Sequence, residues 1–131
     1  MVIVVEESDE LRSTMASTLR HDGHEVIELS DGAQLLARLM GVALLDRRRE
    51  SVAVVTSSQA SVLAVLRMLR SARWRTPVVL VTNEVPRAPE GEIDAVATLA
   101  KPVDLDALRA AVWEAVTRRP SAGSWASRPG G

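Results

Sequence analysis

The stretch VIVVEESDELRSTMASTLRHDG, residues 2–23, contains one complete unit of strand and helix. Its first four residues are a continuous β-branched run, typical of a strand that is covered on both faces. Ser8 is a favourable N-cap, and Asp9 and Glu10 complement the helix dipole in the first turn. Apolar residues then recur at helical spacing until Gly23, a residue type that commonly ends helices. The stretch therefore predicts a buried strand followed directly by an amphipathic helix.

The rest of the chain repeats this unit. Further strands are predicted at 26–29, 52–55, 77–81 and 95–99, and further helices at 33–45, 61–73 and 105–118. In the second helix, the residues expected to face the core are Leu35, Leu36, Leu39 and Met40. Strands that alternate with helices predict a doubly wound α/β fold with a parallel five-stranded sheet. Residues 83–94 read NEVPRAPEGEID, and two prolines there are incompatible with a full helix, so we expect a fourth helix that is shortened or replaced by a Pro-rich loop.

Length and composition narrow the function classes. The 131 residues are enough for one domain, expected at 1–119, and the Pro-, Gly- and Ser-rich tail at 120–131 is expected to be disordered or a linker. The absence of cysteine excludes disulfides and thiolate metal sites. The net charge of −1 does not indicate direct nucleic-acid binding, so the arginines at 47–49 and 67–75 are interpreted as a solvated surface. No apolar run is long enough to cross a bilayer, and we expect a cytoplasmic protein without a membrane segment.

Polar residues follow three of the predicted strands. Glu6 and Glu7 come directly after the first strand, and Thr82 follows the fourth. The pair Lys101-Pro102 follows the fifth strand. The carboxyl ends of parallel strands form one edge of the sheet, where ligands and chemistry usually lie. Adjacent carboxylates there suit a hard cation such as Mg²⁺, and a Lys-Pro bond between a strand and a helix is a candidate for a cis peptide.

Together these residues resemble the receiver domain of response regulators, over residues 2 to about 118. The stretches that carry the resemblance are the opening at 2–32, PVVLVTN at 77–83 and LAKPVDLDALRAAV at 99–112. The resemblance implies a flavodoxin-like (βα)5 fold and a place in bacterial two-component signal transduction. In that family the acidic pair holds Mg²⁺, and an Asp at the end of the third strand accepts a phosphoryl group from a histidine kinase. Thr82 matches the family's switch hydroxyl and Lys101 its lysine, both of which bond the phosphoryl oxygens.

Three features of the family are missing. The phosphoacceptor position falls at Thr56, in SVAVVTSSQ at 51–59, where no carboxylate is present. A hydroxyl needs a base before it can act as a nucleophile, whereas a carboxylate does not. The position of the switch aromatic holds Thr98, in a chain without Phe or Tyr, and the fourth helix is interrupted. Glu6 and Glu7 are then a vestigial pair that binds Mg²⁺ weakly at most.

The resulting hypothesis is a pseudo-receiver: a phosphorylation-independent module for protein–protein interaction or dimerisation, with no enzymatic activity and no cofactor. We expect Lys101 to pair with Glu6 or Glu7 without a metal. The surface expected to contact a protein partner or a second copy is formed by the last helix and the fifth strand. Trp113 and Arg109 are its candidate residues, because aromatic residues and Arg are enriched in interfaces.

Two alternatives stay open at the level of sequence. In the first, GVALLD at 41–46 is the third strand, and Asp46 or a hydroxyl near Thr56, such as that of Ser57, accepts a phosphoryl group. Placing the strand at 41–46 leaves too little chain for a full second helix and leaves the run VAVV without a role. In the second, the domain senses a small ligand in the pocket beside Thr56.

Overall fold

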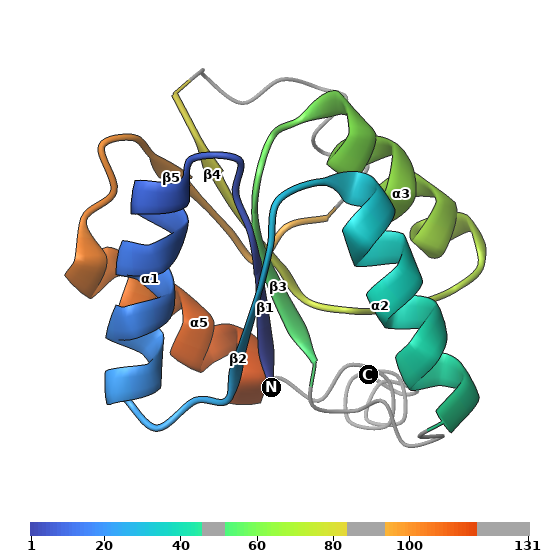
Figure 1. Ribbon diagram of the computed structural model, residues 1–131, viewed down its shortest axis with the longest axis horizontal. Helices are drawn as coiled ribbons and strands as arrows, with labels where there is room; N and C mark the ends of the chain where they lie inside the picture. Colours follow the sequence, from blue (N-terminus) through green and yellow to red (C-terminus); the bar gives the residue numbers. More distant parts are fainter. Residues whose placement is uncertain (46–51, 84–93, 118–131) are drawn as a thin grey trace, which may run out of the picture.

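The computed structural model describes residues 1–45, 52–83 and 94–117. The strands are β1 (Val2–Val5), β2 (Val26–Leu29), β3 (Ala53–Ser57), β4 (Val78–Thr82) and β5 (Ala97–Ala100). The described helices are α1 (Asp9–His21), α2 (Gly32–Leu45), α3 (Ala60–Ser71) and α5 (Leu105–Thr117). All neighbouring strands are parallel, in the order β2-β1-β3-β4-β5 (Figure 1). The predicted α/β fold is confirmed, and this strand order is the flavodoxin-like one.

Both ends of α1 follow from residues that the sequence marks. The hydroxyl of Ser8 accepts a hydrogen bond from the backbone N–H of Leu11 at 3.3 Å and so caps the first turn. Gly23 follows the helix with φ +96°, a conformation that side chains rarely adopt. The first turn is acidic and the last turn is basic, as the helix dipole favours. The predicted limits of this unit are therefore confirmed.

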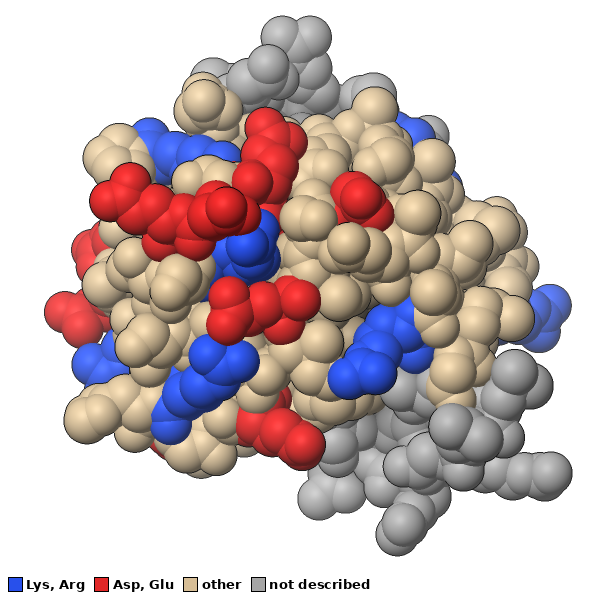
Figure 2. All heavy atoms as spheres, in the orientation of Figure 1, with Lys and Arg blue, Asp and Glu red and all other residues tan. Residues whose placement is uncertain are grey.

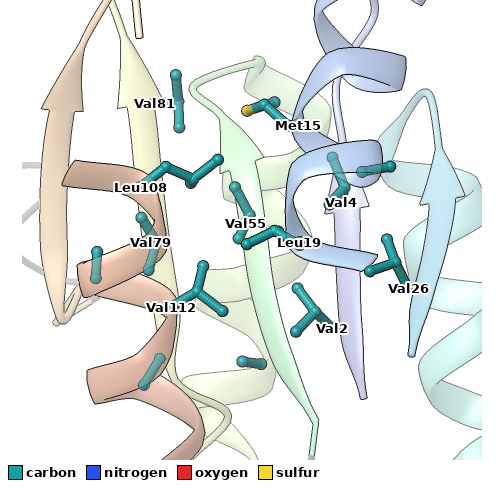
Figure 3. Packing of buried hydrophobic residues seen from close by; sticks show 14 residues of the cluster. Val2, Val4, Met15, Leu19, Val26, Val55, Val79, Val81, Leu108 and Val112 are labelled. Atoms are coloured by element: carbon teal, nitrogen blue, oxygen red, sulfur yellow. The ribbon is translucent and has the colours of Figure 1, made fainter. Parts of the chain in front are cut away.

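Two helical layers cover the sheet, α1 and α5 on one face and α2 and α3 on the other (Figure 1). Along β1, Val2 and Val4 pack under α1 and α5, whereas Ile3 and Val5 pack under α2 and α3. This is the alternation that a strand imposes on successive side chains. Figure 3 shows Leu19 of α1 among the strand valines of the first layer. The helix side chains that are fully or almost fully buried are Leu, Val, Met and Ala in the α1 and α5 layer, and Leu and Val in the α2 and α3 layer.

The helices α2 and α3 approach each other closely at their first turns. The backbone N–H of Gly32 donates a hydrogen bond to the hydroxyl of Ser61 at 3.2 Å. A Cβ atom at Gly32 would lie 2.5 Å from the backbone oxygen of Ser61, which is too close for any side chain. Glycine at the start of α2 is therefore required by this helix–helix contact.

Two sequence predictions are corrected by the structure. Residues 41–45 are the end of α2, so the alternative reading of 41–46 as the third strand is wrong. Met40 is 47% exposed and does not face the core as predicted. The core row of α2 runs through Leu35 and Leu39, and Met40 lies about 100° further round the helix, in line with 3.6 residues per turn.

Three predicted features lie wholly or partly outside the described residues. These are Asp46, the Pro-rich interval, of which 84–93 are not described, and the tail at 120–131. Among the helices that the structure does describe, none has the length and apolar character needed to span a bilayer.

Candidate functional site

The carboxyl ends of the central strands bring the sequence-predicted polar residues to one edge of the sheet. On β1, Val5 pairs with Thr56 of β3, and Glu6 is the next residue after Val5. On β5, Ala100 pairs with Thr82 of β4, and Lys101 is the next residue after Ala100. The backbone N–H of Lys101 donates to the carbonyl of Thr82 at 2.9 Å and holds the end of β5 against β4. This edge is where ligands bind in open α/β sheets, so it is the candidate site.

Glu6 is the buried acid of this edge, with 1% of its surface exposed. Its Oε1 lies 3.2 Å from Nζ of Lys101, and its Oε2 accepts a hydrogen bond from the backbone N–H of Ser8 at 3.0 Å. The guanidinium of Arg12 donates to the backbone carbonyl of Glu6 at 2.8 Å. Among the described residues Oε1 has no partner of hydrogen-bond geometry, so the nearby ammonium is its main compensation for burial. The expected ion pair is thus found, and it uses Glu6.

Glu7 does not join this pair. Its side chain is exposed, one residue beyond the buried Glu6. Within residues 1–45, 52–83 and 94–117 there is no group of three His, Cys, Asp or Glu side chains that could hold a metal ion. A divalent cation at this edge needs several oxygen ligands, preferably charged. The carboxylate of Glu6 is already neutralised by Lys101, and β3 adds hydroxyls alone, so this donor set does not fit Mg²⁺.

The end of β3 carries two buried hydroxyls. Thr56 is fully buried, and its hydroxyl donates to the backbone carbonyl of Ser57 at 2.9 Å. Because Thr56 pairs with Val5, the next residue, Ser57, is level with Glu6. The hydroxyl of Ser57 accepts a hydrogen bond from the side-chain amide of Gln59 at 3.1 Å. Register therefore makes Ser57, rather than Thr56, the β3 residue beside the buried acid. The sequence prediction ended the strand at Val55, two residues early, and gave no signal for this shift.

Thr82 is almost fully buried at the end of β4 and is joined to the loop after β3. Its hydroxyl lies 3.1 Å from the hydroxyl of Ser58, and either oxygen is able to donate. This contact joins the first residue after β3 to the last residue of β4. Ser58 received no role from the sequence, because its partner is 24 residues away and no local pattern connects them.

The two remaining sequence-predicted positions lie on or beside β5. The Lys101-Pro102 peptide bond is cis, as expected for this pair. Thr98 occupies the position assigned to the switch aromatic, and its side chain is exposed. The strand itself is half-covered, with alternating intermediate and exposed residues.

The outer surface of α5 carries the candidate interface residues. Trp113 is 65% exposed. Arg109 donates to Asp22 at 2.8 Å, across to the end of α1, and to Asp106 at 3.3 Å. This hydrogen bond from Arg109 holds the pKa of Asp22 below its ordinary value of 3.8. These side chains, with His24 and Ala110, line a shallow groove of about 340 Å³ between α1 and α5, which we call the α5 groove.

Comparisons with known proteins agree with this architecture. No family model matches the chain, and no curated protein matches it. The receiver domain of the Francisella response regulator 1452 superposes with a TM-score of 0.72 at 17% identity, over 89% of this chain and 96% of that one. The chemotaxis response regulator CheY4 of Vibrio cholerae superposes with a TM-score of 0.67 at 21% identity, over 87% of this chain and 96% of that one.

A longer response regulator is similar in the same way. StyR superposes with a TM-score of 0.72 at 20% identity over 88% of this chain, which spans 58% of the length of StyR. The chain therefore has the fold of response-regulator receiver domains.

Proposed function

We propose that this domain is a pseudo-receiver, a phosphorylation-independent module for protein–protein interaction or dimerisation in bacterial signal transduction. The observation that carries the proposal is the state of the carboxyl edge. Its buried acid, Glu6, is already paired with Lys101, and β3 offers hydroxyls where a carboxylate is needed. The groups that a phosphorylation switch requires are thus replaced by a closed polar cluster that needs neither metal nor phosphate.

The chemistry of β3 supports this proposal. A Ser or Thr hydroxyl attacks phosphorus only when a base removes its proton, while a carboxylate is a nucleophile at neutral pH. The carboxylate level with Ser57 is Glu6, which is engaged by an ammonium and a backbone N–H. The hydroxyl of Thr56 is turned to the backbone of its own strand. Among the described residues, the printed partners of these hydroxyls are a backbone carbonyl and the amide of Gln59 rather than a base, which supports a domain without catalytic activity.

Signalling output then depends on surfaces rather than on chemistry. The domain would act in the cytoplasm, in contact with other signalling proteins or with copies of itself. Trp113 and Arg109 on α5 are the candidate contact residues, since a large exposed indole beside a guanidinium is typical of interfaces. Phosphodonors should leave this surface unchanged.

An amide NMR titration tests the proposal. Mg²⁺ is added first, followed by beryllofluoride, which mimics an aspartyl phosphate. We expect no saturable shift at Thr82 or Lys101 and no change along α5. Saturable shifts at those two residues that spread to α5 would show a working switch and would contradict the proposal.

A matched variant serves as the positive control for the NMR titration with Mg²⁺ and beryllofluoride. Ser57→Asp places a carboxylate level with Glu6 and so restores the missing acid of the edge. We expect this variant to show Mg²⁺-dependent shifts at Glu6 and Lys101 that the wild-type chain lacks. Thr56→Asp, one residue earlier, should respond less because register places it opposite Val5.

A further inference from the structure

The two halves of the described chain carry opposite charge. Residues 32–45 and 52–83 contain five arginines and no acidic residue, whereas residues 1–31 and 94–117 contain twelve acidic residues, three arginines and one lysine. The first set includes both helices of the α2 and α3 layer, and the second includes both helices of the α1 and α5 layer. Two acids of the second set lie beside the basic layer: Asp31 accepts a hydrogen bond from the backbone N–H of Gln34 at the start of α2, and Asp94 interacts with Arg70 of α3. In Figure 2 red side chains gather on the side where Figure 1 shows α1 and β2, while the surface over α2 and α3 is mostly tan.

An apolar strip lies between α2 and α3 on the basic half. Met40 and Met68 are each 47% exposed. Met40 comes eight residues after Gly32 on α2, and Met68 comes seven residues after Ser61 on α3. The two helices run in parallel, so the methionines lie at similar distances along the helix axes from the Gly32–Ser61 contact, about 12 and 10 Å. Seven residues are close to two turns, so Met68 lies on the side of α3 that faces α2. Eight residues place Met40 about 80° round α2 from Gly32, at the solvent-exposed margin of the side that faces α3. We call this strip the α2–α3 seam.

Arginines flank the seam. Arg38 is exposed, and at two residues before Met40 it lies on the opposite edge of the α2 surface. Arg67 adjoins Met68 and lies on the α3 edge that faces away from α2, by the same helical spacing. Exposed methionines of this kind are common at binding surfaces because the thioether adapts its shape and contacts aromatic rings favourably. The seam therefore suits a partner with an aromatic anchor between carboxylates.

The outer face of α5 is such a partner surface. Trp113 is its exposed anchor, and Asp22 and Asp106 lie beside it in the α5 groove. Two carboxylates and one guanidinium, that of Arg109, leave the groove with an excess of negative charge. A second copy of this chain thus presents an aromatic anchor and a charge that complement the seam.

We propose that the α5 groove of one copy docks on the α2–α3 seam of a second copy, with Trp113 against Met40 and Met68. Seam against seam is disfavoured, because the two helices that form the seam, 32–45 and 60–71, carry arginines and no acid. The contact is therefore heterologous, and each copy keeps one unused seam or groove, so assembly continues into rings or open chains. This inference goes beyond the proposed function, since it assigns the contact surfaces, and it holds whether or not the domain responds to phosphorylation.

Complementing variants test the arrangement by sedimentation velocity. Met68→Glu disables the seam, and Trp113→Ala disables the groove; both side chains are exposed, so both variants should fold. We expect the wild-type mass to rise with concentration beyond that of a dimer, and each variant alone to associate about tenfold more weakly or worse, as loss of a central anchor predicts. An equimolar mixture of the two variants should form a dimer and nothing larger, because one intact seam meets one intact groove.

Each other outcome overturns the proposal. A wild-type chain that stays monomeric up to about 1 mM excludes the contact at any useful affinity. Association that survives Met68→Glu but not Trp113→Ala would place the contact between two α5 surfaces. A mixture that remains monomeric would show a symmetric interface in place of a heterologous one. Glu10→Gln, at the far end of α1 from the groove, is the control and should associate like the wild type. The NMR titration with beryllofluoride tests the pseudo-receiver proposal separately.

Discussion

The α1 and α5 layer and the α2 and α3 layer are alike inside and unlike outside. Both pack apolar helix side chains against the same valine-rich strands with almost no exposure: Leu, Val, Met and Ala in the first layer, and Leu and Val in the second. Outside, the first layer carries acids tied to arginines, such as Glu28 to Arg20 at 2.9 Å and Asp22 to Arg109 at 2.8 Å. In the second, the helices α2 and α3 carry arginines and exposed methionines and have no acid within their own bounds. Packing of the core therefore determines the fold on both faces of the sheet, and it does not constrain the charge of either outer surface.

The largest loss of stability should come from substitutions in the core, and it should be equal for the two layers. Leu19→Ala in the first layer and Leu66→Ala in the second each remove a buried side chain, and we expect each to lower the free energy of unfolding by about 3 kcal/mol. Urea unfolding measures both. If either variant lowers the free energy of unfolding by less than about 1 kcal/mol, its layer is loosely packed, and the two layers are not alike inside.

The next effect concerns the ion pair of the carboxyl edge. Lys101→Met leaves the buried carboxylate of Glu6 without its counter-charge, and we expect a loss of about 2 kcal/mol, reduced from the usual cost because the lysine side chain is 26% exposed. Glu6→Gln in the same chain should recover part of that loss. A double variant no more stable than Lys101→Met alone would show that the charge of Glu6 is not what the lysine compensates.

The hydroxyl contact at the ends of β3 and β4 should matter less. Ser58→Ala removes one partner of the 3.1 Å contact with Thr82, and we expect a loss of about 1 kcal/mol. Ser71→Ala, at the exposed end of α3, is the matched control and should change stability little. If thermal unfolding shows the same loss of stability for both substitutions, the contact of Ser58 with Thr82 does not stabilise the site.

The smallest effect is a pH dependence confined to the acidic layer. Arg109 lowers the pKa of Asp22, so their pairing stabilises the fold above the ordinary pKa of 3.8 and is lost as the pH falls further. Arg109→Ala should make stability fall less steeply below about pH 4. Arg38→Ala, on a helix that carries no acid within its own bounds, should leave that slope unchanged. The same slope for the wild type and Arg109→Ala would show that the pair contributes nothing measurable.

Much of the fold is local and was predictable. The β-branched run of Val2–Val5, the Ser8 cap and the glycine at position 23 act within a few residues, and the structure confirms them. The candidate site was predictable in part. Glu6 and Lys101 are found together as predicted, because all strands of a parallel sheet have their carboxyl ends at one edge. The sequence did not decide whether Lys101 pairs with Glu6 or with Glu7, because the burial of Glu6 and the exposure of Glu7 depend on the whole sheet.

By itself, the sequence determined the alternation of strands and helices, the absence of a carboxylate at the end of β3, and the uneven distribution of acids along the chain. These are properties of residue type and spacing, which need no partner elsewhere in the molecule. Tertiary structure alone decided that Ser57 lies level with Glu6, that Ser58 meets Thr82, and that Met40 faces outward. The physical reason is that register and helix rotation are set by contacts between segments far apart in the chain, where a shift of one residue turns a side chain to another surface.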